Sequence, residues 1–276
     1  FRYLCLLFCF FVAHFLMPFS SDDYVMFFDV GQGDSALINV NKNVTLIDTG
    51  GMVSFDNSEY KYKIAKNKII PYLKANGIRK IDNMILTHGD ADHMKEAVYI
   101  ANNFKVDKVI FNCGEFNSLE NELVDVLKRR NISYSSCVNE VVVDKYKLKF
   151  LNTGIYDNEN DNSSVIYFKY NKYKFLFMGD AGVDREGDIL NKYKLGRIDF
   201  LKVGHHGSNT SSSYEFISSI SPRYSVISVG ENNRFGHPRD EVLDVLSKSK
   251  VYRTDMDGSV KIFLNKDSYD IRFWRP

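Results

Sequence analysis

Apolar residues are distributed in two ways along this chain. From Tyr3 to Phe19 nearly every residue is apolar and none carries a formal charge. After residue 20, short runs rich in β-branched and aromatic residues alternate with polar turns and with longer segments of helical spacing. This pattern predicts a short N-terminal apolar helix, residues 1–19, followed by one domain of alternating strands and helices, residues 24–276.

The N-terminal apolar segment is close to the shortest helix that crosses a bilayer, which needs about 20 apolar residues. Three interpretations fit it: part of a transmembrane helix, the core of a signal peptide, or a buried helix. The following residues, LMPFSSDD, match a signal cleavage site poorly. We therefore expect a membrane helix that continues an upstream transmembrane region. With Arg2 before it, this helix would place the domain on the extracytoplasmic side of the cell membrane.

Within the domain, the same pattern predicts a series of strands and helices. The predicted strands are 24–30, 35–40, 44–51, 82–88, 108–112, 141–152, 163–180, 199–206, 224–230, 251–253 and 259–274. The predicted helices are 58–76, with a break near Pro71, and 93–104, 118–131, 211–220 and 239–249. Two sheets with helices on their outer faces would bury the apolar side of every element in this list.

The charge and cysteine content exclude some classes of protein. Lys and Arg number 36 and Asp and Glu number 35, so the formal net charge is +1. A protein that wraps nucleic acid by bulk charge needs a larger basic excess. The four cysteines form no Cys-x-x-Cys pair, which excludes a zinc ribbon and a thioredoxin-type motif. We expect Cys113 and Cys137 to be small buried apolar side chains.

A dense group of metal-ligating residues follows the apolar run MILT. The sequence THGDADH places His88, Asp90, Asp92 and His93 within six residues. Imidazole nitrogens and carboxylate oxygens together suit Zn²⁺, Mn²⁺ or Fe²⁺. A surface turn is also rich in Asp, His and Gly, but four potential ligands at the end of a buried strand favour a metal site.

Further predicted strands also end in potential metal ligands. Asp180 follows the apolar run KFLFM, His205 and His206 follow LKV, and His237 comes soon after the strand predicted at 224–230. Each motif alone is weak evidence for a metal site, because Gly-Asp turns and isolated histidines are common. Together with the first group, these strand ends carry five of the six histidines of the chain. We expect the strand ends to converge on one metal site.

These motifs, in this order, resemble those of the metallo-β-lactamase superfamily, and within it the hydrolase domain of ComEC-type competence proteins, the bacterial DNA-uptake channels. The resemblance covers about residues 24–265 and rests on FDVGQGDS (28–35), LIDTG (46–50), HGDADH (88–93), GD (179–180), GHHGS (204–208) and GHP (236–238). It implies an α+β or α/β fold, a four-layer αββα sandwich with a two-metal site at one edge.

The resemblance also implies roles for the residues of the site. Two divalent ions, Zn²⁺ or Mn²⁺, would bind between the sheets, with Asp180 bridging them. Which of His205 and His206 is a ligand stays open. The implied metal ligands are His88, Asp90, Asp92, His93, Asp180 and His206, and the implied catalytic residues are Asp92, His205, His206 and His237.

Three more residues receive supporting roles from the resemblance. Asp34 and Asp48 would orient the ligands through hydrogen bonds, and Ser208 would donate to a substrate phosphate. A metal-bound hydroxide would attack phosphorus or a carbonyl carbon. No His lies between His93 and Asp180, where many members of the superfamily have one. The first ion would then have fewer protein ligands, which suits a harder ion such as Mn²⁺.

The implied function is a metal-dependent nuclease or phosphodiesterase acting on DNA during competence DNA uptake. Two alternatives stay open: a surface phosphodiesterase for cell-wall or small phosphoesters, and a non-catalytic domain that binds DNA or a partner. The basic stretch 61–74 could grip a phosphate backbone, with Tyr60 and Tyr62 as stacking platforms, or it could be a solvated helix face.

Overall fold

The computed structural model describes Tyr3 and residues 22–51 and 63–275. Apart from Tyr3, the predicted apolar helix lies outside these residues, and so do Tyr60, Lys61 and Tyr62. No helix within the described ranges is long and apolar enough to cross a bilayer.

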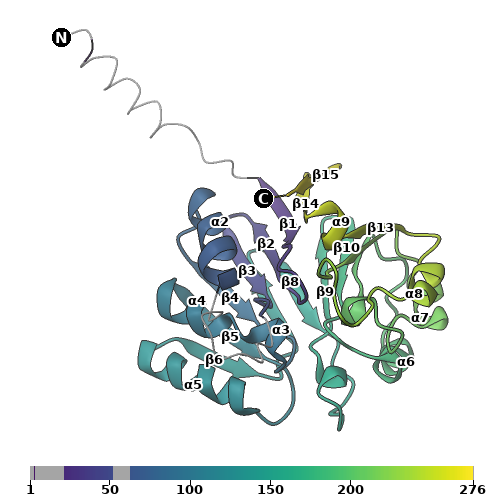
Figure 1. The fold of residues 1–276 in the computed structure, drawn as a ribbon, viewed down its shortest axis with the longest axis horizontal. Coiled ribbons are helices and arrows are strands. Elements are labelled where there is room, and N and C mark those ends of the chain that lie inside the picture. The colour runs from purple at the N-terminus through teal and green to yellow at the C-terminus, as the bar shows by residue number, and fades with distance from the viewer. Residues whose placement is uncertain (1–2, 4–21, 52–62, 276) are drawn as a thin grey trace.

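Two mixed sheets lie face to face in the described part of the chain (Figure 1). The eight-stranded sheet has the order β15 (Tyr269–Trp274), β14 (Ser259–Leu264), β1 (Asp23–Phe27), β2 (Ala36–Val40), β3 (Asn43–Ile47), β4 (Ile81–Ile85), β5 (Val106–Phe111) and β6 (Ser133–Ser136). The seven-stranded sheet has the order β13 (Lys250–Arg253), β12 (Tyr224–Ile227), β11 (Phe200–Lys202), β10 (Tyr173–Phe177), β9 (Ile166–Tyr170), β8 (Tyr146–Phe150) and β7 (Glu140–Val143).

Each sheet contains a block of parallel strands. Strands β3 to β6 are parallel in the first sheet, and strands β10 to β13 are parallel in the second. The carboxyl ends of parallel strands meet at one edge of a sheet. The loops after β3 and β4 therefore lie together, as do the loops after β10, β11 and β12.

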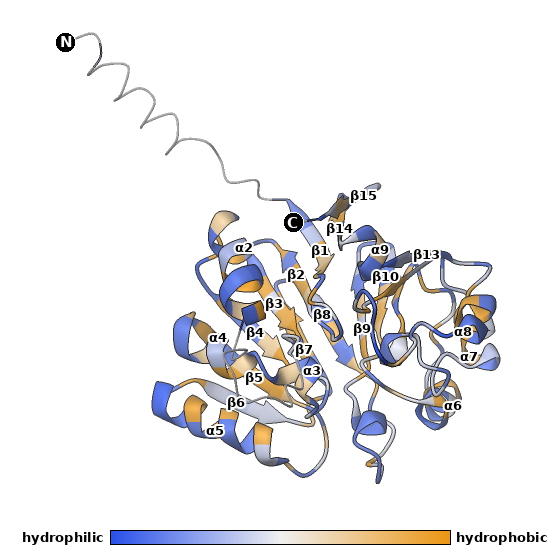
Figure 2. Ribbon diagram, viewed as in Figure 1, coloured by the Kyte–Doolittle hydropathy of each residue, from blue (hydrophilic) through white to orange (hydrophobic). Residues whose placement is uncertain are grey.

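Alternation of side chains along the strands builds the core between the sheets. In β1, Val25 and Phe27 point into this inner layer, whereas Tyr24 and Met26 point to the outer face. The rings of Phe27 and Phe177 meet across the layer with centroids 5.8 Å apart. Figure 2 shows the strands as largely hydrophobic and the outer faces of the helices as hydrophilic.

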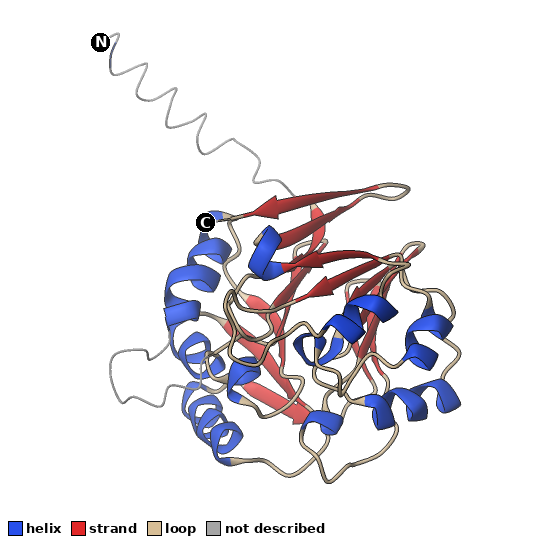
Figure 3. Ribbon diagram, turned by 45° about the vertical axis from the view of Figure 1, so that its right-hand side comes forward, coloured by secondary structure: helices blue, strands red, loops and turns tan. Residues whose placement is uncertain are grey.

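Helices cover both outer faces of the two sheets (Figure 3). Helices on the first sheet are the π-helical turn η1 (Ala65–Ile69), α2 (Ile70–Ala75), α4 (Ala97–Asn103) and α5 (Ser118–Arg130). Helices on the second sheet are α6 (Val183–Lys192), α7 (Tyr214–Ile220) and α8 (Asp240–Val245). The remaining short helices are α3 (Ala91–Met94), η2 (Asn160–Asn162), η3 (Gly204–Gly207) and α9 (Thr254–Asp257). The expected αββα sandwich is confirmed.

Some local features differ from the sequence prediction. Helix α6 and strand β6 were not predicted: α6 buries the charged residues Arg185 and Glu186 beside Ile189, and β6 is polar and largely exposed. The break expected near Pro71 takes the form of the π-helical turn η1, which directly precedes α2. A wider turn before proline accommodates its missing N–H.

Cys113 and Cys137 form a disulfide, with Cα atoms 4.4 Å apart. The expectation that both are small buried apolar side chains is wrong: Cys113 is partly buried and Cys137 is exposed. The pair joins the ends of the parallel neighbours β5 and β6, where Phe111 stands opposite Ser136. The two cysteines are 24 positions apart, and only the strand pairing brings them together.

Candidate metal centre

Side chains from the ends of three strands meet between the two sheets. His88 and His93 follow β4, Asp180 follows β10, and His206 follows β11. Asp180 Oδ1 lies 3.1 Å from His93 Nε2, and Asp180 Oδ2 lies 4.0 Å from His88 Nε2 and 3.7 Å from His206 Nε2. On the other side, His206 Nε2 lies 3.3 Å from Asp92 Oδ2. The fold thus places Asp180 in the middle of the cluster.

The cluster has the properties of a cation site. His88 Nε2, His93 Nε2, His206 Nε2 and Asp180 Oδ1 are all buried and have no hydrogen-bond partner. Buried polar atoms in a folded protein are almost always satisfied, so the convergence of these four atoms, of which His93 Nε2 and Asp180 Oδ1 lie 3.1 Å apart, suits the binding of a cation. Two overlapping groups have the spacing of metal ligands: His88, His93 and Asp180, and Asp92, His93 and His206. The donor set of imidazole and carboxylate fits the divalent ions expected from the sequence.

His93 is oriented by a hydrogen-bond network behind it. Its Nδ1 lies 2.9 Å from Asp48 Oδ2 and donates its N–H to this carboxylate, which leaves Nε2 facing Asp180. Asp48 is held in turn by the backbone N–H and the hydroxyl of Thr87, both at 2.7 Å. Such a partner fixes the tautomer and makes the imidazole a better ligand.

His206 is supported in the same way from the second sheet. Its Nδ1 donates to the Ser228 carbonyl at 2.9 Å and lies 3.3 Å from Asp34 Oδ1. Lys202 Nζ binds the other oxygen of Asp34 at 2.7 Å. His206 Nε2 is therefore left free to face Asp92 and Asp180. The structure singles out His206, of the two adjacent histidines, as the one buried in the cluster.

His88 has two hydroxyl groups behind it. Thr87 Oγ1 lies 3.2 Å and Ser163 Oγ 3.3 Å from its Nδ1. Ser163 Oγ also accepts the backbone N–H of Asp180 at 3.0 Å. In front, Asp90 Oδ2 lies 3.6 Å from His88 Nε2, and about half of the Asp90 side chain is exposed. This side of the cluster therefore has fewer protein donors and opens to solvent.

The charges in the cluster favour a cation. Burial opposes protonation of His93, but the carboxylates of Asp180 and Asp48 outweigh it and raise the pKa of His93 well above its usual range. Burial alone would raise the pKa of Asp180, but the neighbouring His93 and His206 imidazoles lower it well below its usual range. Burial likewise opposes protonation of His206, yet Asp180 and Asp34 raise its pKa to about 10.

Two glycine loops brace the turn that carries Asp92 and His93. Asp34 N–H donates to the Asp92 carbonyl at 3.1 Å, and Thr49 N–H donates to the His93 carbonyl at 2.6 Å. The backbone approaches so closely that a Cβ on Gly33 would lie 2.3 Å from Asp92 O. The motif at residues 31–35 thus supports the site through its backbone, and Asp34 adds the contact to His206.

His205 turns away from the buried cluster toward the cleft. Its Nε2 lies 3.7 Å from Asp180 Oδ2, and its Nδ1 is hydrogen-bonded to Thr210 Oγ1 at 2.8 Å. Burial, only partly offset by Asp180, lowers the pKa of His205. His237 lies edge-on to His205 with ring centroids 5.9 Å apart and is not part of either ligand group. Ser208 is buried and its hydroxyl contacts Thr210 at 3.0 Å, so it faces its own loop and not the cleft.

A third group of potential ligands, Asp34, Asp48 and His93, lies behind the cluster. This group already has its counter-charges. Lys202 Nζ contacts Asp34, and the Nδ1–H of His93 donates to Asp48. It therefore supports the site from behind and does not offer a further cation site.

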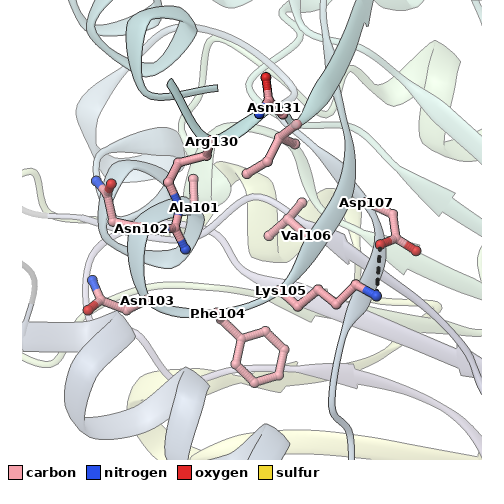
Figure 4. Close-up of a pocket in the computed structure, with 10 residues that line it drawn as sticks. Ala101, Asn102, Asn103, Phe104, Lys105, Val106, Asp107, Arg130 and Asn131 are labelled. Carbon is pink, nitrogen blue, oxygen red and sulfur yellow. Dashed lines mark ion pairs between the residues drawn. The ribbon is translucent and has the colours of Figure 1, made fainter. Parts of the chain in front are cut away.

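The cluster opens into a cleft of about 760 Å³, which Asp90, Asp92, Asp180 and His205 line. Another cavity, of about 650 Å³, lies at the opposite edge of the first sheet, between the ends of α4 and α5 and the starts of β5 and β6 (Figure 4). Two of its charged residues, Asp107 and Lys105, are paired with each other, and Asp107 is also paired with Lys80. It contains none of the predicted site residues.

Several residues of the site carry no motif in the sequence. Ser163 and Thr210 contact histidines through their hydroxyl groups, Ser228 does so through its backbone carbonyl, and Lys202 acts through Asp34. A weak signal existed only for Lys202, a charged residue within a strand that is otherwise apolar. Hydroxyl groups in loops are too common for sequence reasoning to single out.

The chain belongs to the metallo-beta-lactamase superfamily, whose model matches residues 28–231. Within this class, its curated relatives include competence proteins, as expected from the motifs. The chain is 31% identical over 256 residues to ComE operon protein 3 of Bacillus subtilis and 29% identical over 249 residues to Competence protein ComA of Neisseria gonorrhoeae. These alignments cover 88% of this chain but 33% and 32% of the relatives, so the chain spans about a third of their length.

Solved structures support the fold. The metallo-beta-lactamase fold protein YhfI from Bacillus subtilis superposes with a TM-score of 0.55 and 11% identity, covering 84% of this chain and 96% of that protein. A diphosphatase of the PhnP family superposes with a TM-score of 0.51 and 13% identity, covering 87% and 98%. At this level of identity the likeness concerns the fold alone.

Proposed function

We propose that this chain is a divalent-metal-dependent phosphodiesterase that cuts DNA during competence DNA uptake. The observation that carries the proposal is the convergence of four buried ligand atoms without hydrogen-bond partners at one edge of the sandwich. The superfamily membership and the competence proteins among its relatives support the assignment to DNA.

We divide the ligands as the order of the motifs implies; His93 belongs to both ligand groups of the structure. His88, Asp90 and Asp180 would hold one ion at the open side, and Asp92, His93, Asp180 and His206 would hold the other at the buried side. Asp180 suits a bridging role because its two oxygens face different histidines. Such ions would supply Lewis acidity and would lower the pKa of a bound water molecule.

The remaining residues of the cleft would act on the substrate. His205 is hydrogen-bonded through Nδ1, so its Nε2 faces the cleft beside Asp180 and can hold or release a proton at the leaving oxygen. Burial, followed by the nearby His206 and His205, lowers the pKa of His237 to about 4. His237 is therefore neutral at physiological pH and would contact phosphate as a neutral hydrogen-bonding group.

We further propose that the domain lies on the extracytoplasmic side of the cell membrane, attached through the apolar N-terminal segment. The disulfide between Cys113 and Cys137 supports this placement, because disulfides persist in oxidising compartments. An upstream membrane region would then deliver DNA to the cleft.

The test is cleavage of labelled DNA by the purified chain with Mn²⁺ or Zn²⁺. We expect cleavage by the wild type and its loss in Asp92→Ala, while Asp125→Ala, an exposed aspartate on α5, serves as the matched control and retains it. Equal cutting by Asp92→Ala and the wild type would contradict the proposal.

The same preparation separates the two alternative functions. A surface phosphodiesterase would hydrolyse choline phosphoesters faster than oligonucleotides. A non-catalytic binding domain would hydrolyse neither and would hold fewer than one tightly bound ion per chain by mass spectrometry. We expect two ions per chain and a preference for oligonucleotides.

A further inference from the structure

The loop between β12 and α8 carries an exposed aromatic ring at the metal cleft. Phe235 is 45% exposed and lines the cleft together with Asp180 and His205. Its ring stacks on His237, with centroids 5.8 Å apart and an interplanar angle of 25°. His237 in turn contacts His205 edge-on. The rings of Phe235, His237 and His205 therefore form a row between solvent and Asp180.

Hydrogen bonds within the loop hold this ring in place. Asn233 Nδ2 donates to the carbonyls of Gly230 and His237 at 3.1 and 2.7 Å, and Asn233 Oδ1 accepts the N–H of His237 at 3.0 Å. The side chain of one residue thus ties both ends of the loop on either side of Phe235. A ring already held in place loses little conformational entropy when a ligand stacks on it.

Two cations line the cleft beside the ring. The Arg234 guanidinium lies over the Phe235 ring, 5.0 Å from its centroid. Lys68 Nζ donates to the Asp29 carbonyl at 2.8 Å and lies 3.5 Å from Asp29 Oδ2. Glu231 lines the cleft as well, so a carboxylate accompanies each cation. An exposed aromatic ring accompanied by cations is an arrangement that stacks on a nucleobase and contacts its neighbouring phosphates.

We propose that Phe235 forms a stacking subsite for an unpaired base next to the phosphodiester bound at the metal centre, with Arg234 and Lys68 on the flanking phosphates. The ligand is therefore a single-stranded nucleic acid, since in a duplex both faces of each base are covered by stacked neighbours. A small phosphoester without a base would not use this ring. The inference rests on the proposed function for the position of the bound phosphate.

The test compares two single strands that differ only in their bases. Equilibrium binding of the Mn²⁺-loaded chain of residues 1–276 is measured by fluorescence anisotropy on a hydrolysis-resistant phosphorothioate strand and on the same backbone made of abasic units. Phe235→Ala should raise Kd for the base-bearing strand roughly 5- to 100-fold and leave Kd for the abasic strand unchanged. Phe235→Tyr should restore binding. Equal changes for both strands, no change, or no binding by the wild type would overturn the proposal.

Control variants separate stacking from charge and from general damage. Phe273→Ala removes a ring of the same type and similar exposure, 46%, on β15 and outside the cleft lining; it should leave both Kd values unchanged. Lys68→Gln should raise the Kd values of both strands by the same factor and should reduce the salt dependence of binding. If Phe273→Ala lost as much affinity for the base-bearing strand as Phe235→Ala, the proposal of a stacking subsite would be overturned.

Cleavage distinguishes this inference from the proposed function. If the base-bearing strand binds in a Phe235-dependent way but an unmodified strand is never cut, the proposed function fails and the subsite stands. If unmodified strands are cut equally well by the wild type and Phe235→Ala, with equal Kd values, the proposed function stands and the subsite fails.

Discussion

Lys202 Nζ lies 2.7 Å from Asp34 Oδ2 beneath the metal centre, and both side chains are almost fully buried. Burial alone would raise the pKa of Asp34, but Lys202 and then His206 lower it well below its usual range. The carboxylate thus stays charged and contacts His206 Nδ1 at 3.3 Å. This buried ion pair places a negative charge behind a predicted metal ligand.

We predict that Asp34→Asn weakens metal binding and destabilises the fold. Losing the charge behind His206 should lower metal affinity about 10- to 100-fold, measured by competition with a chelating dye. It also leaves the Lys202 ammonium buried without a counter-charge, which should lower the free energy of unfolding by about 3–5 kcal/mol in urea titrations.

Two controls accompany this change. Glu140→Gln breaks the exposed pair with Lys147, also 2.7 Å long, and should cost less than about 1 kcal/mol. Adding Lys202→Met to Asp34→Asn should recover stability but not metal affinity. Wild-type affinity in Asp34→Asn would contradict the role of this carboxylate.

Metal binding should stabilise the chain through Asp180. A divalent ion at about 100 times its Kd should raise the free energy of unfolding by about 2.7 kcal/mol, and EDTA should reverse the gain. In Asp180→Asn, which keeps the shape but loses the bridging charge, thermal unfolding should no longer respond to the ion. Asp184→Asn, an exposed aspartate on α6, should respond like the wild type. A full response in Asp180→Asn would place the ion elsewhere.

The disulfide should contribute to stability without taking part in metal binding. Reduction, or the double change Cys113→Ser and Cys137→Ser, should lower the free energy of unfolding by about 3 kcal/mol, because the bridge closes a loop between residues 24 positions apart. Metal affinity should stay unchanged. A reducing agent should not affect the double variant, and a stability change there would assign the effect to another cause.

Glu186 should make stability fall as pH rises. Its buried carboxylate accepts the N–H groups of Ser212 and Ser213 at 2.6 and 2.8 Å, but burial dominates and raises its pKa to about 7. Between the unfolded value near 4.5 and 7 the folded chain binds more protons than the unfolded chain. The free energy of unfolding should therefore fall across this window by at most about 3 kcal/mol.

Glu186→Gln tests this contribution because it removes the titration and keeps the shape. Urea unfolding on both sides of the window should show a smaller fall in the variant than in the wild type. The comparison isolates Glu186 from the histidines of the metal centre, which titrate in both proteins. An unchanged pH slope would contradict the assignment.

The sequence predicted the alternation of strands and helices and the gathering of potential ligands at strand ends. Apolar runs of strand length end in His or Asp at His88, Asp180 and His205, and parallel strands deliver their ends to one edge. The fold class followed from the alternation of strands and helices and from the resemblance to a known superfamily. Helix α6 was missed, because its buried face contains the charged residues Arg185 and Glu186.

Distant partners that lie outside the motifs could not be predicted. Ser163 approaches His88 from 75 positions away, and the pairing of Cys113 with Cys137 depends on the register of β5 and β6. Such contacts depend on the packing of one sheet on the other and leave no periodic signal. Hydroxyl side chains are also neutral in the hydrophobic pattern from which the elements were derived, and a cysteine counts as a small apolar residue in that pattern whether or not it is paired.

The sequence by itself determined that histidines and carboxylates gather at strand ends, because strand periodicity and residue chemistry are local properties. It placed His205 and His206 side by side and left their roles open. Tertiary structure decided between them: both adopt left-handed backbone conformations, with φ of 47° and 53°, and their rings point in different directions. His206 turns inward because the Ser228 carbonyl, supplied by the loop after β12, accepts its Nδ1–H. His205 is left at the cleft, where Thr210 orients it.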